Sequence, residues 1–296
     1  MTQQKKIITF NDYLRKKYNC KVYRIPLNTG LICPNRLNGN SSCIYCDEFG
    51  SGARLYPENI QTIAEQVKYG IELFSQTRKA EKFYVYFQSF SNTFGNIETL
   101  KKLYDSAFID DRICGLIIGT RPDCINNEIL ELINSYSKKY DVWLELGLQS
   151  ANNKTLEFIK RGHTLEDYFA AADLCHKYNL KIVTHIILGL PYETKTDMIN
   201  TAKAVKSAKS EGIKIHSLYI IKNTELAKIY ETSKFQLLTF DEYVNIVCEI
   251  IKDILPAEII YHRLTGETDN ARTIAPEWIK NKTAVLNAIK SNISTK

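Results

Sequence analysis

The chain has 296 residues, of which 44% are hydrophobic and 24% are charged, and its formal net charge is +6. This composition is ordinary for a globular protein, and no apolar run approaches the roughly 18 residues that a membrane-spanning helix needs, so no membrane partner is expected. The positive charge permits a polyanionic partner such as nucleic acid but is too small to identify one.

Short apolar runs alternate with amphipathic stretches along the chain. Runs of β-branched and aromatic residues predict strands over 22–28, 83–90, 114–120, 142–148, 182–188 and 213–220. Apolar residues at helical spacing predict helices over 60–77, 97–106, 127–139, 153–159, 165–178 and 196–211. A further helix over 240–254 and a seventh strand over 258–264 are expected after them.

Strand–helix units in this order predict a parallel sheet that is covered by its own crossover helices. Six units are too few for a complete barrel of eight strands, so the expected fold class is α/β, a partial (β/α)6 TIM-like barrel with a small C-terminal α/β extension. The expected division is an N-terminal extension over 1–20, the barrel over 21–222 and the C-terminal extension over 223–296. Ligands of such folds bind beyond the C-terminal ends of the strands.

Three cysteines, Cys33, Cys43 and Cys46, follow the first predicted strand with the spacing C-x9-C-x2-C. The first interval is rich in turn-forming residues: Pro34, Asn35, Asn38, Gly39 and Asn40. A structural zinc ion and a fully protein-held iron–sulfur cluster each take four ligands, so three thiolates favour a 4Fe-4S cluster with one open iron. A zinc site completed by a distant His or Cys is the alternative.

The remaining cysteines lack metal-type spacing. Reduced thiols of this kind are typical of a cytoplasmic protein, and most are small buried side chains. They are Cys20, Cys114, Cys124, Cys175 and Cys248.

Polar side chains also follow the other predicted strands. They are Gln88, Ser89, Asn92, Arg121, Gln149 and Ser150. Such residues at one or two strand ends commonly cap the next helix, but a series of them beside three thiolates predicts one site at the mouth of the barrel. Glu145 lies inside the fourth predicted strand, where a buried carboxylate requires a partner from the protein or from a ligand.

These motifs together resemble the radical S-adenosylmethionine superfamily. The first cysteine interval is longer than the commonest C-x3-C-x2-C pattern of that superfamily and is similar to that of the elongator catalytic subunit. Segments 86–90, 120–124, 144–150, 161–164, 185–191 and 214–219 resemble the bacterial YtqA/YhcC-type members. The resemblance extends from about residue 21 to residue 266.

The resemblance implies that Cys33, Cys43 and Cys46 bind a 4Fe-4S cluster whose open iron chelates S-adenosyl-L-methionine. One-electron reduction of this sulfonium yields a 5′-deoxyadenosyl radical. The residues implied to contact S-adenosylmethionine are Gln88, Ser89, Asn92, Arg121, Glu145, Gln149, Arg161 and His185. The segment around the first three lacks the double glycine and the acid of the usual methionine-binding motif, and an ion pair for Arg161 and a structural role for His185 are the alternatives.

The elongator-like resemblance further implies a substrate and partners. It points to modification of the side chain of the tRNA wobble uridine, with an electron donor of the flavodoxin or ferredoxin type. No acetyl-transfer domain is expected after the C-terminal extension, which favours a standalone radical step. His262 and Arg263, in the segment 262–266, resemble a family motif and are expected to close the barrel mouth or touch substrate; a packed edge strand with an exposed Arg263 is the alternative.

Two hypotheses from other classes remain open at this point. One is a radical enzyme that acts on a small metabolite, which tRNA would not stimulate. The other is a zinc-stabilised RNA-binding protein without catalysis, which metal content and colour would distinguish from an iron–sulfur protein.

Overall fold

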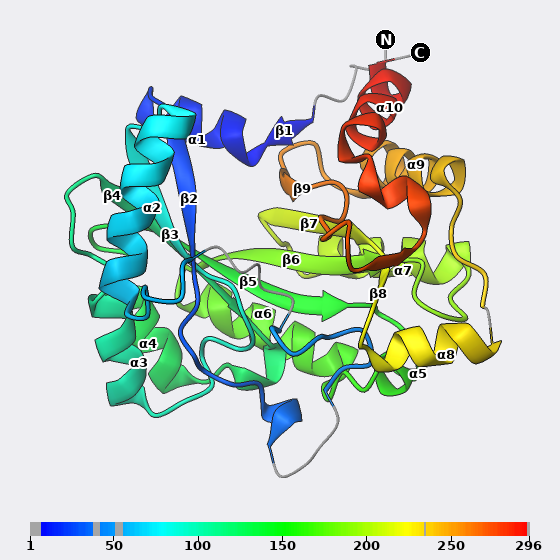
Figure 1. Cartoon of the computed structure of the whole chain (residues 1–296), viewed down its shortest axis with the longest axis horizontal. Helices are drawn as coiled ribbons and strands as arrows, with labels where there is room; N and C mark the ends of the chain where they lie inside the picture. Colours follow the sequence, from blue (N-terminus) through cyan, green and yellow to red (C-terminus); the bar gives the residue numbers. More distant parts are fainter. Residues whose placement is uncertain (1–6, 38–41, 51–55, 234, 295–296) are drawn as a thin grey trace.

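The structure is a computed structural model that describes residues 7–37, 42–50, 56–233 and 235–294. The described part contains one parallel sheet of eight strands, ordered β1-β9-β7-β6-β5-β4-β3-β2, which curves through the middle of the molecule (Figure 1). A separate two-stranded antiparallel sheet joins β8 (Ile220–Ile221) to β10 (Thr273–Ala275). Among the described helices, none combines the length and apolar character that a membrane crossing requires.

The six central strands confirm the predicted partial barrel. β2 to β7 are Val22–Leu27, Lys82–Phe87, Ile113–Thr120, Asp141–Gln149, Lys181–Leu188 and Gly212–Ser217. Each pairs in parallel with the next along the chain. Their nearly continuous apolar character reflects burial of both faces, which is typical of parallel sheets.

Two further strands extend the sheet beyond β7. β9 (Ile260–Arg263) pairs in parallel with β7 and confirms the seventh strand expected over 258–264. β1 (Ile8–Thr9) pairs with β9, so both ends of the chain contribute to this edge. The N-terminal strand was not anticipated, because a two-residue element carries no periodic pattern.

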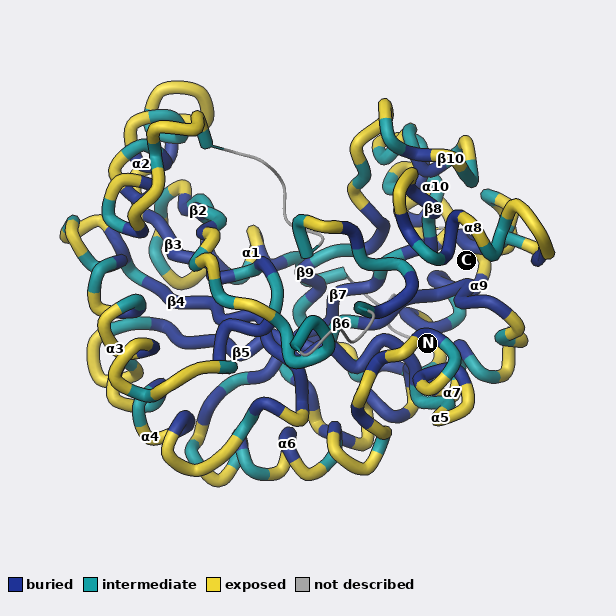
Figure 2. Tube along the Cα trace, turned by 60° about the horizontal axis from the view of Figure 1, so that its bottom comes forward, coloured by how far each residue is buried: buried dark blue, intermediate teal, exposed yellow. Residues whose placement is uncertain are grey.

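The crossover helices lie outside the curved sheet and expose one face each (Figure 2). α2 to α7 are Ile63–Arg78, Ile97–Asp105, Asn127–Tyr136, Asn153–Phe158, Leu165–Lys177 and Lys195–Ser207. Capping boxes start several of them: Thr62 accepts from the backbone N–H of Glu65, whose carboxylate accepts in return, and Thr164 and Thr194 begin α6 and α7 in the same way. These caps set where each helix starts after its strand.

The other helices belong to the two ends of the chain. α9 (Phe240–Glu249) continues as a π-helical turn over Ile250–Ile254, as expected for the segment 240–254, and packs against α10 (Lys282–Ser294). α8 (Glu225–Ser233) lies beside the middle of the cysteine-bearing loop, where the Leu226 backbone donates to Ile44. α1 (Phe10–Tyr18) packs against the inward side chains of the barrel.

Inside the barrel, an apolar layer lies toward the N-terminal ends of the strands. Its buried members are Phe10, Leu14, Val22, Tyr84, Tyr86, Ile117, Trp143 and Val183. Gly115 is needed there, because a Cβ atom at this position would lie 2.1 Å from Cε1 of Tyr84. Among the described residues, this layer fills the barrel toward the N-terminal strand ends, which leaves the C-terminal strand ends as the side for a ligand.

Candidate active site

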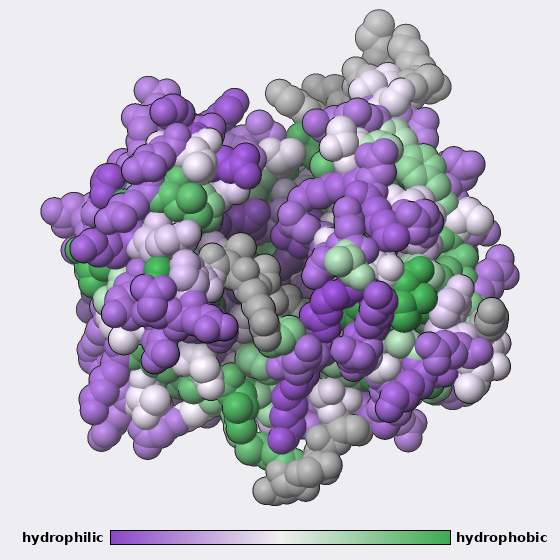
Figure 3. Space-filling model, viewed as in Figure 1, coloured by the Kyte–Doolittle hydropathy of each residue, from purple (hydrophilic) through white to green (hydrophobic). Residues whose placement is uncertain are grey.

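A cavity opens at the C-terminal ends of the strands. It is lined by the loop after β2, by side chains from β3 to β7 and by β9 with the segment that follows it. Figure 3 shows this face of the molecule to be mostly hydrophilic and hollowed near its middle. The predicted site residues that line the cavity are Cys33, Cys43, Cys46, Gln88, Arg121, Glu145, Gln149, Arg161 and His185.

Ser89 and Asn92 do not line the cavity, although both were predicted to contact the cofactor. The Asn92 amide donates to the carbonyl oxygens of Ser89 and Gly119, at 3.0 Å each, and its Oδ1 accepts from Thr29 at 3.0 Å. An amide used in this way holds the turn after β3. Direct contact of these two residues with a cofactor stays a prediction.

The cysteine loop (residues 33–50) is held by neighbouring segments. The backbone N–H of Ile44 donates to the carbonyl of Ile159 at 3.2 Å, and that of Leu226 donates to the carbonyl of Ile44 at 2.8 Å. The ends of α5 and α8 therefore fix the middle of this loop. The turn-forming residues Asn38 to Asn40 lie outside the described residues.

Hydrogen-bond donors lie beside the sulfur atoms. Arg121 Nη1 is 3.7 Å from Cys33 Sγ, and Arg36 Nη2 is 3.3 Å from Cys46 Sγ. Arg121 is itself held by a two-pronged ion pair with Asp123, with N–O distances of 2.8 and 2.6 Å. Cationic donors of this kind stabilise thiolates and, through hydrogen bonds to sulfur, tune the potential of a cluster.

Cys43 has two such neighbours. Asn35 Nδ2 lies 3.4 Å from its Sγ, and Arg161 Nη1 lies 3.8 Å away. Asn35 also donates to the carbonyl oxygens of Lys160 and Arg161, at 2.8 and 3.1 Å, so it connects the cysteine loop to the turn after α5.

Arg161 is positioned by a glycine of β5. Its Nη2 donates to the Gly147 carbonyl at 2.8 Å, and a Cβ atom on Gly147 would lie 2.4 Å from that same nitrogen. Burial disfavours the charge of Arg161, but nearby Tyr45 and Cys43 outweigh burial and raise the pKa of its guanidinium. Arg161 is therefore a buried cation facing the cysteines.

Gln149, the last residue of β5, has an unusual backbone conformation and an unpaired side-chain oxygen among the described residues. Its backbone has φ = 73°, a left-handed conformation that costs energy for a residue other than glycine. Its side chain is 5% exposed, and its Oε1 has no hydrogen-bond partner among the described residues. A buried acceptor without a partner at a cavity wall fits a residue that binds a ligand donor.

Glu145 has its partner within the protein. Its Oε1 lies 2.7 Å from Lys214 Nζ, and its Oε2 accepts from the Tyr86 hydroxyl at 2.7 Å. Burial alone would raise the pKa of Glu145, but Lys214 lowers it to about 2. Burial lowers the pKa of Lys214 to about 8 although Glu145 opposes this shift.

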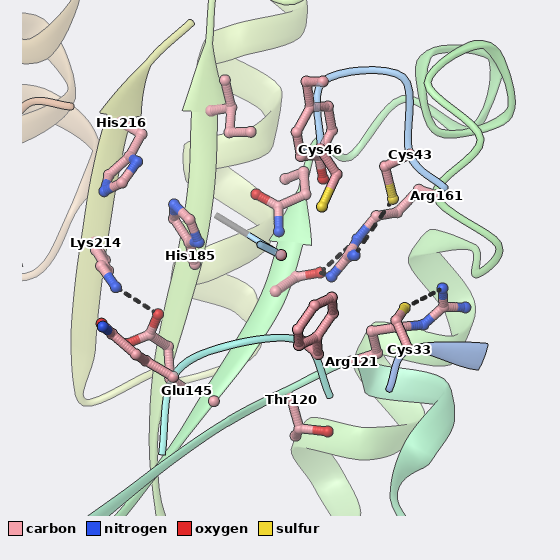
Figure 4. Close-up of a pocket in the computed structure, with 18 of the residues that line it drawn as sticks. Cys33, Cys43, Cys46, Thr120, Arg121, Glu145, Arg161, His185, Lys214 and His216 are labelled. Atoms are coloured by element: carbon pink, nitrogen blue, oxygen red, sulfur yellow. Dashed lines mark hydrogen bonds and ion pairs between the residues drawn. The ribbon is translucent and has the colours of Figure 1, made fainter. Parts of the chain in front are cut away.

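Several lining residues were not identified from the sequence. Lys214 and His216 lie on the wall of the cavity opposite the cysteines (Figure 4). The sequence did carry a signal for them, because they are two positions apart on one strand, on either side of Ile215, and so point to the same side. Of the motif His262-Arg263, Arg263 lines the cavity, whereas the His262 ring stacks on Phe10 with centroids 4.0 Å apart.

The five remaining cysteines are not in the cavity wall. Cys124, Cys175 and Cys248 are buried, as expected for structural side chains, while Cys20 and Cys114 are only partly buried.

The arrangement of the three cysteines fits a 4Fe-4S cluster. In the described part of the chain, no three His, Cys, Asp or Glu side chains are gathered closely enough to hold a metal ion. Each thiolate of a 4Fe-4S cluster binds a different iron, so its ligands do not have to meet at one point. The three cysteines face one cavity, have N–H donors at their sulfurs and lie near an unpartnered Gln149 oxygen, which suits a cluster with a bound cofactor.

Comparison with known proteins gives consistent results. Residues 27–223 match the model of the Radical SAM superfamily, and residues 210–295 match the Radical_SAM C-terminal domain. YtqA of Bacillus subtilis is 34% identical over 297 residues, covering 99% of this chain and 91% of YtqA. The tRNA uridine(34) acetyltransferase of Methanocaldococcus jannaschii is 29% identical over 192 residues, covering 62% of this chain and 33% of that protein.

A solved structure shares the fold. The Elp3 protein of the archaeon Methanocaldococcus infernus, with an N-terminal deletion, superposes with a TM-score of 0.69 at 18% identity. The match covers 92% of this chain but only 63% of that one, so the relative carries substantial additional structure. Because the superfamily model covers most of the chain and YtqA is similar along nearly all of it, the protein belongs to the radical SAM superfamily, whose cofactors are a 4Fe-4S cluster and S-adenosylmethionine.

Proposed function

We propose that the protein is a radical S-adenosylmethionine enzyme in which Cys33, Cys43 and Cys46 bind the 4Fe-4S cluster. The observation that carries this proposal is the placement of the three thiols on one wall of the cavity, with N–H donors from Asn35, Arg36, Arg121 and Arg161 at their sulfurs. When bound, the cluster and S-adenosylmethionine supply a 5′-deoxyadenosyl radical by reductive cleavage of the sulfonium.

The chain's own residues bind and orient the cofactor. Arg161 offers a buried guanidinium beside the cluster ligands, which suits the carboxylate of S-adenosylmethionine. Gln149 offers an unpartnered oxygen to an N–H or O–H of the cofactor. Gln88, Glu145 and His185 line the same cavity and are proposed to complete the contacts. Filled toward its other end by the apolar layer, the barrel keeps bulk water from the reacting atoms.

The proposed substrate is tRNA, modified on the side chain of its wobble uridine. Similarity to a protein named tRNA uridine(34) acetyltransferase supports this, and the net charge of +6 suits a polyanion. A flavodoxin- or ferredoxin-type protein is proposed as electron donor, and the cytoplasm as the location.

The test is anaerobic reconstitution with iron and sulfide, followed by reduction and assay of 5′-deoxyadenosine with and without bulk undermodified tRNA. Cleavage that tRNA enhances supports both parts of the proposal. Cleavage that tRNA leaves unchanged keeps the radical chemistry and redirects the search to a small metabolite. A protein that takes up no iron and cleaves no cofactor contradicts the cluster assignment.

Two variants sharpen this experiment. Cys43→Ala removes a proposed cluster ligand and is expected to abolish cleavage while the barrel stays folded, as judged by circular dichroism. Cys248→Ala removes a buried thiol on α9, outside the cavity, and is the matched control that keeps cleavage. Normal cleavage by Cys43→Ala would remove this residue from the ligand set.

A further inference from the structure

The wall of the cavity opposite the cysteines is polar. β7 supplies Lys214 and His216, and β9 supplies Arg263. Figure 4 shows Lys214 and His216 on one side of the cavity and the cysteines with Arg121 and Arg161 on the other. A molecule that lies between the two walls touches both sets of residues.

Donors on this wall remain available after the contacts within the protein are made. Lys214 has three N–H donors and uses two of them, toward Glu145 and Tyr86 at 2.7 and 2.8 Å. Arg263 Nη1 lies 3.4 Å from His216 Nε2. Because arginine can only donate, His216 Nε2 is the acceptor, and the ring proton of neutral His216 is on Nδ1. His216 therefore has a second nitrogen with a donor to offer.

Basic side chains gather in this part of the barrel with few carboxylate partners among the described residues. Lys214 and Arg263 each have one carboxylate partner, at 2.7 and 2.9 Å. The partner of Arg263, Glu267, is shared with Lys282 at 3.2 Å. Arg24 of β2 adds a guanidinium beneath them that interacts with Glu145 but forms no ion pair among the described residues. On the cavity wall itself, Lys214 and Arg263 face Glu145 and Glu267, and Arg24 adds a cation behind them.

The environment keeps His216 neutral and disfavours the charge of Lys214. Burial lowers the pKa of His216 well below its usual value, and neighbouring His185 and Arg263 lower it further. Burial likewise lowers the pKa of Lys214 to about 8, and Arg263 contributes to that shift. A bound anion would offset this repulsion among the basic groups.

The ion pair between Lys214 and Glu145 is a poor source of stability. Their side chains are each 8% exposed, and a buried pair is often no more stable than apolar residues of the same volume. A pair of this kind lining a cavity is better explained by binding. The lysine contributes charge, and the carboxylate with Tyr86 holds it in place.

We propose that Lys214, His216 and Arg263 form a binding site for an anionic oxygen group of the substrate, a carboxylate or a phosphate. This inference rests on the proposed function, because it leaves the opposite wall to the cluster and S-adenosylmethionine. Arginine pairs with either anion through two parallel hydrogen bonds, and lysine adds a point charge. The substrate would then be anchored by its anionic group, with its reacting carbon toward the cofactor.

The test uses cluster-loaded protein saturated with S-adenosylmethionine, unfolded by heat at constant ionic strength in sodium chloride, sodium acetate or sodium phosphate. Acetate is the probe for a carboxylate and phosphate the probe for a phosphoryl group. We expect one of them to raise the melting temperature of the wild-type protein by roughly 2 °C over chloride. Arg263→Gln should lose this rise, whereas Arg112→Gln, which changes an exposed pair with Asp110, should keep it.

A second variant tests the same site in case Arg263→Gln loses the rise only because it misfolds. Lys214→Met combined with Glu145→Gln removes both charges of the buried pair, so no unpaired charge is left behind. Because Glu145 is also a proposed cofactor contact, saturation of this variant with S-adenosylmethionine is verified by equilibrium binding first; the saturated variant should fold and also lose the rise. The inference is overturned if neither anion raises the wild-type melting temperature, or if Arg263→Gln keeps the full rise.

The outcome separates the two proposals. An Arg263-dependent rise in a protein that forms no 5′-deoxyadenosine would keep the anion site and reject the radical function. Formation of 5′-deoxyadenosine without any rise would keep the radical function and reject the anion site.

Discussion

Arg272 forms an ion pair with Asp47, the residue directly after Cys46, with 2.8 Å between Nη1 and Oδ2. Its guanidinium also lies over the Phe49 ring, 5.5 Å from the centroid. The Arg272 carbonyl accepts from the backbone N–H of Lys222 at 2.9 Å, which anchors its own segment. The chain after β9 therefore holds the end of the cysteine loop.

Arg272→Ala is expected to loosen the cysteine loop. The variant removes this cation from Asp47, which is 5% exposed, so the free energy of unfolding should fall by about 1 to 2 kcal/mol. The rate at which a chelator strips iron from the reconstituted protein should rise severalfold. Arg112→Ala, which breaks an exposed pair, is the control, and equal rates for both variants would contradict a role of Arg272 in holding the loop.

Gly147→Ala is expected to weaken binding of S-adenosylmethionine. The added Cβ would lie 2.4 Å from Arg161 Nη2 and 2.7 Å from Gln149 Nε2, so both side chains must move. Loss of a charged hydrogen bond costs about 1.5 to 3 kcal/mol, so the dissociation constant should rise at least about tenfold. Equilibrium binding to cluster-loaded protein measures this.

Gly95→Ala is the matched control for that experiment. Its new Cβ would meet its nearest neighbour, a Leu100 methyl group, at 3.5 Å, which is ordinary contact. Wild-type affinity in the Gly147 variant would show that Arg161 and Gln149 do not bind the cofactor.

Lys214→Met alone is expected to destabilise the protein more than Lys214→Met combined with Glu145→Gln. It leaves the Glu145 carboxylate buried without its cation, which typically costs about 3 to 5 kcal/mol. Adding Glu145→Gln removes the charge and should restore most of the loss. Denaturant unfolding of both variants checks this, and equal stability of the single and the double variant would show that the pair is not coupled.

Glu193→Gln is expected to change the pH dependence of stability. The Ser150 hydroxyl donates to Glu193 Oε1, while Oε2 is buried without a partner among the described residues, and burial raises the pKa of Glu193 to about 7. The folded protein then keeps a proton that the unfolded chain releases near the ordinary value of 4.5. Stability due to this group is therefore present below that pH and is lost as the pH rises toward 7.

Between pH 5 and pH 8 the wild-type protein should lose about 2 kcal/mol relative to Glu193→Gln. Denaturant unfolding of both proteins at the two pH values measures the difference. Glu166→Gln, on an exposed turn of α6, should keep the wild-type slope. A Glu193→Gln protein with that same slope would show that the carboxyl group ionises freely.

The central strands were predictable because their physical cause is local. β4 and β5 are buried on both faces and therefore appear as continuous apolar runs, bounded by helices whose apolar residues recur at helical spacing. β1 was not predictable, because two residues become a strand only by pairing with β9. The start of α8 likewise depends on its neighbours, since the Leu226 backbone donates to Ile44 of the cysteine loop.

Some features of the candidate site could likewise be predicted from the sequence, and others could not. Sequence spacing and motif resemblance were enough to predict the cysteines, Gln149 and Arg161 as lining residues of one site, because strand ends of a parallel sheet meet at one edge. Asn92 shares that edge, but its amide is occupied by hydrogen bonds to the carbonyl oxygens of Ser89 and Gly119 that no sequence pattern reveals.

By itself, the sequence determined the order of strands and helices, the partial barrel and the three-thiolate loop at its mouth, because apolar periodicity and cysteine spacing act over a few neighbouring residues. Only the tertiary structure decided which charges meet. Glu145 and Lys214 are 69 positions apart, and Asp47 and Arg272 are 225 apart. Ion pairs act over a few ångströms, so partners this far apart in sequence are selected only when the chain folds into the partial barrel.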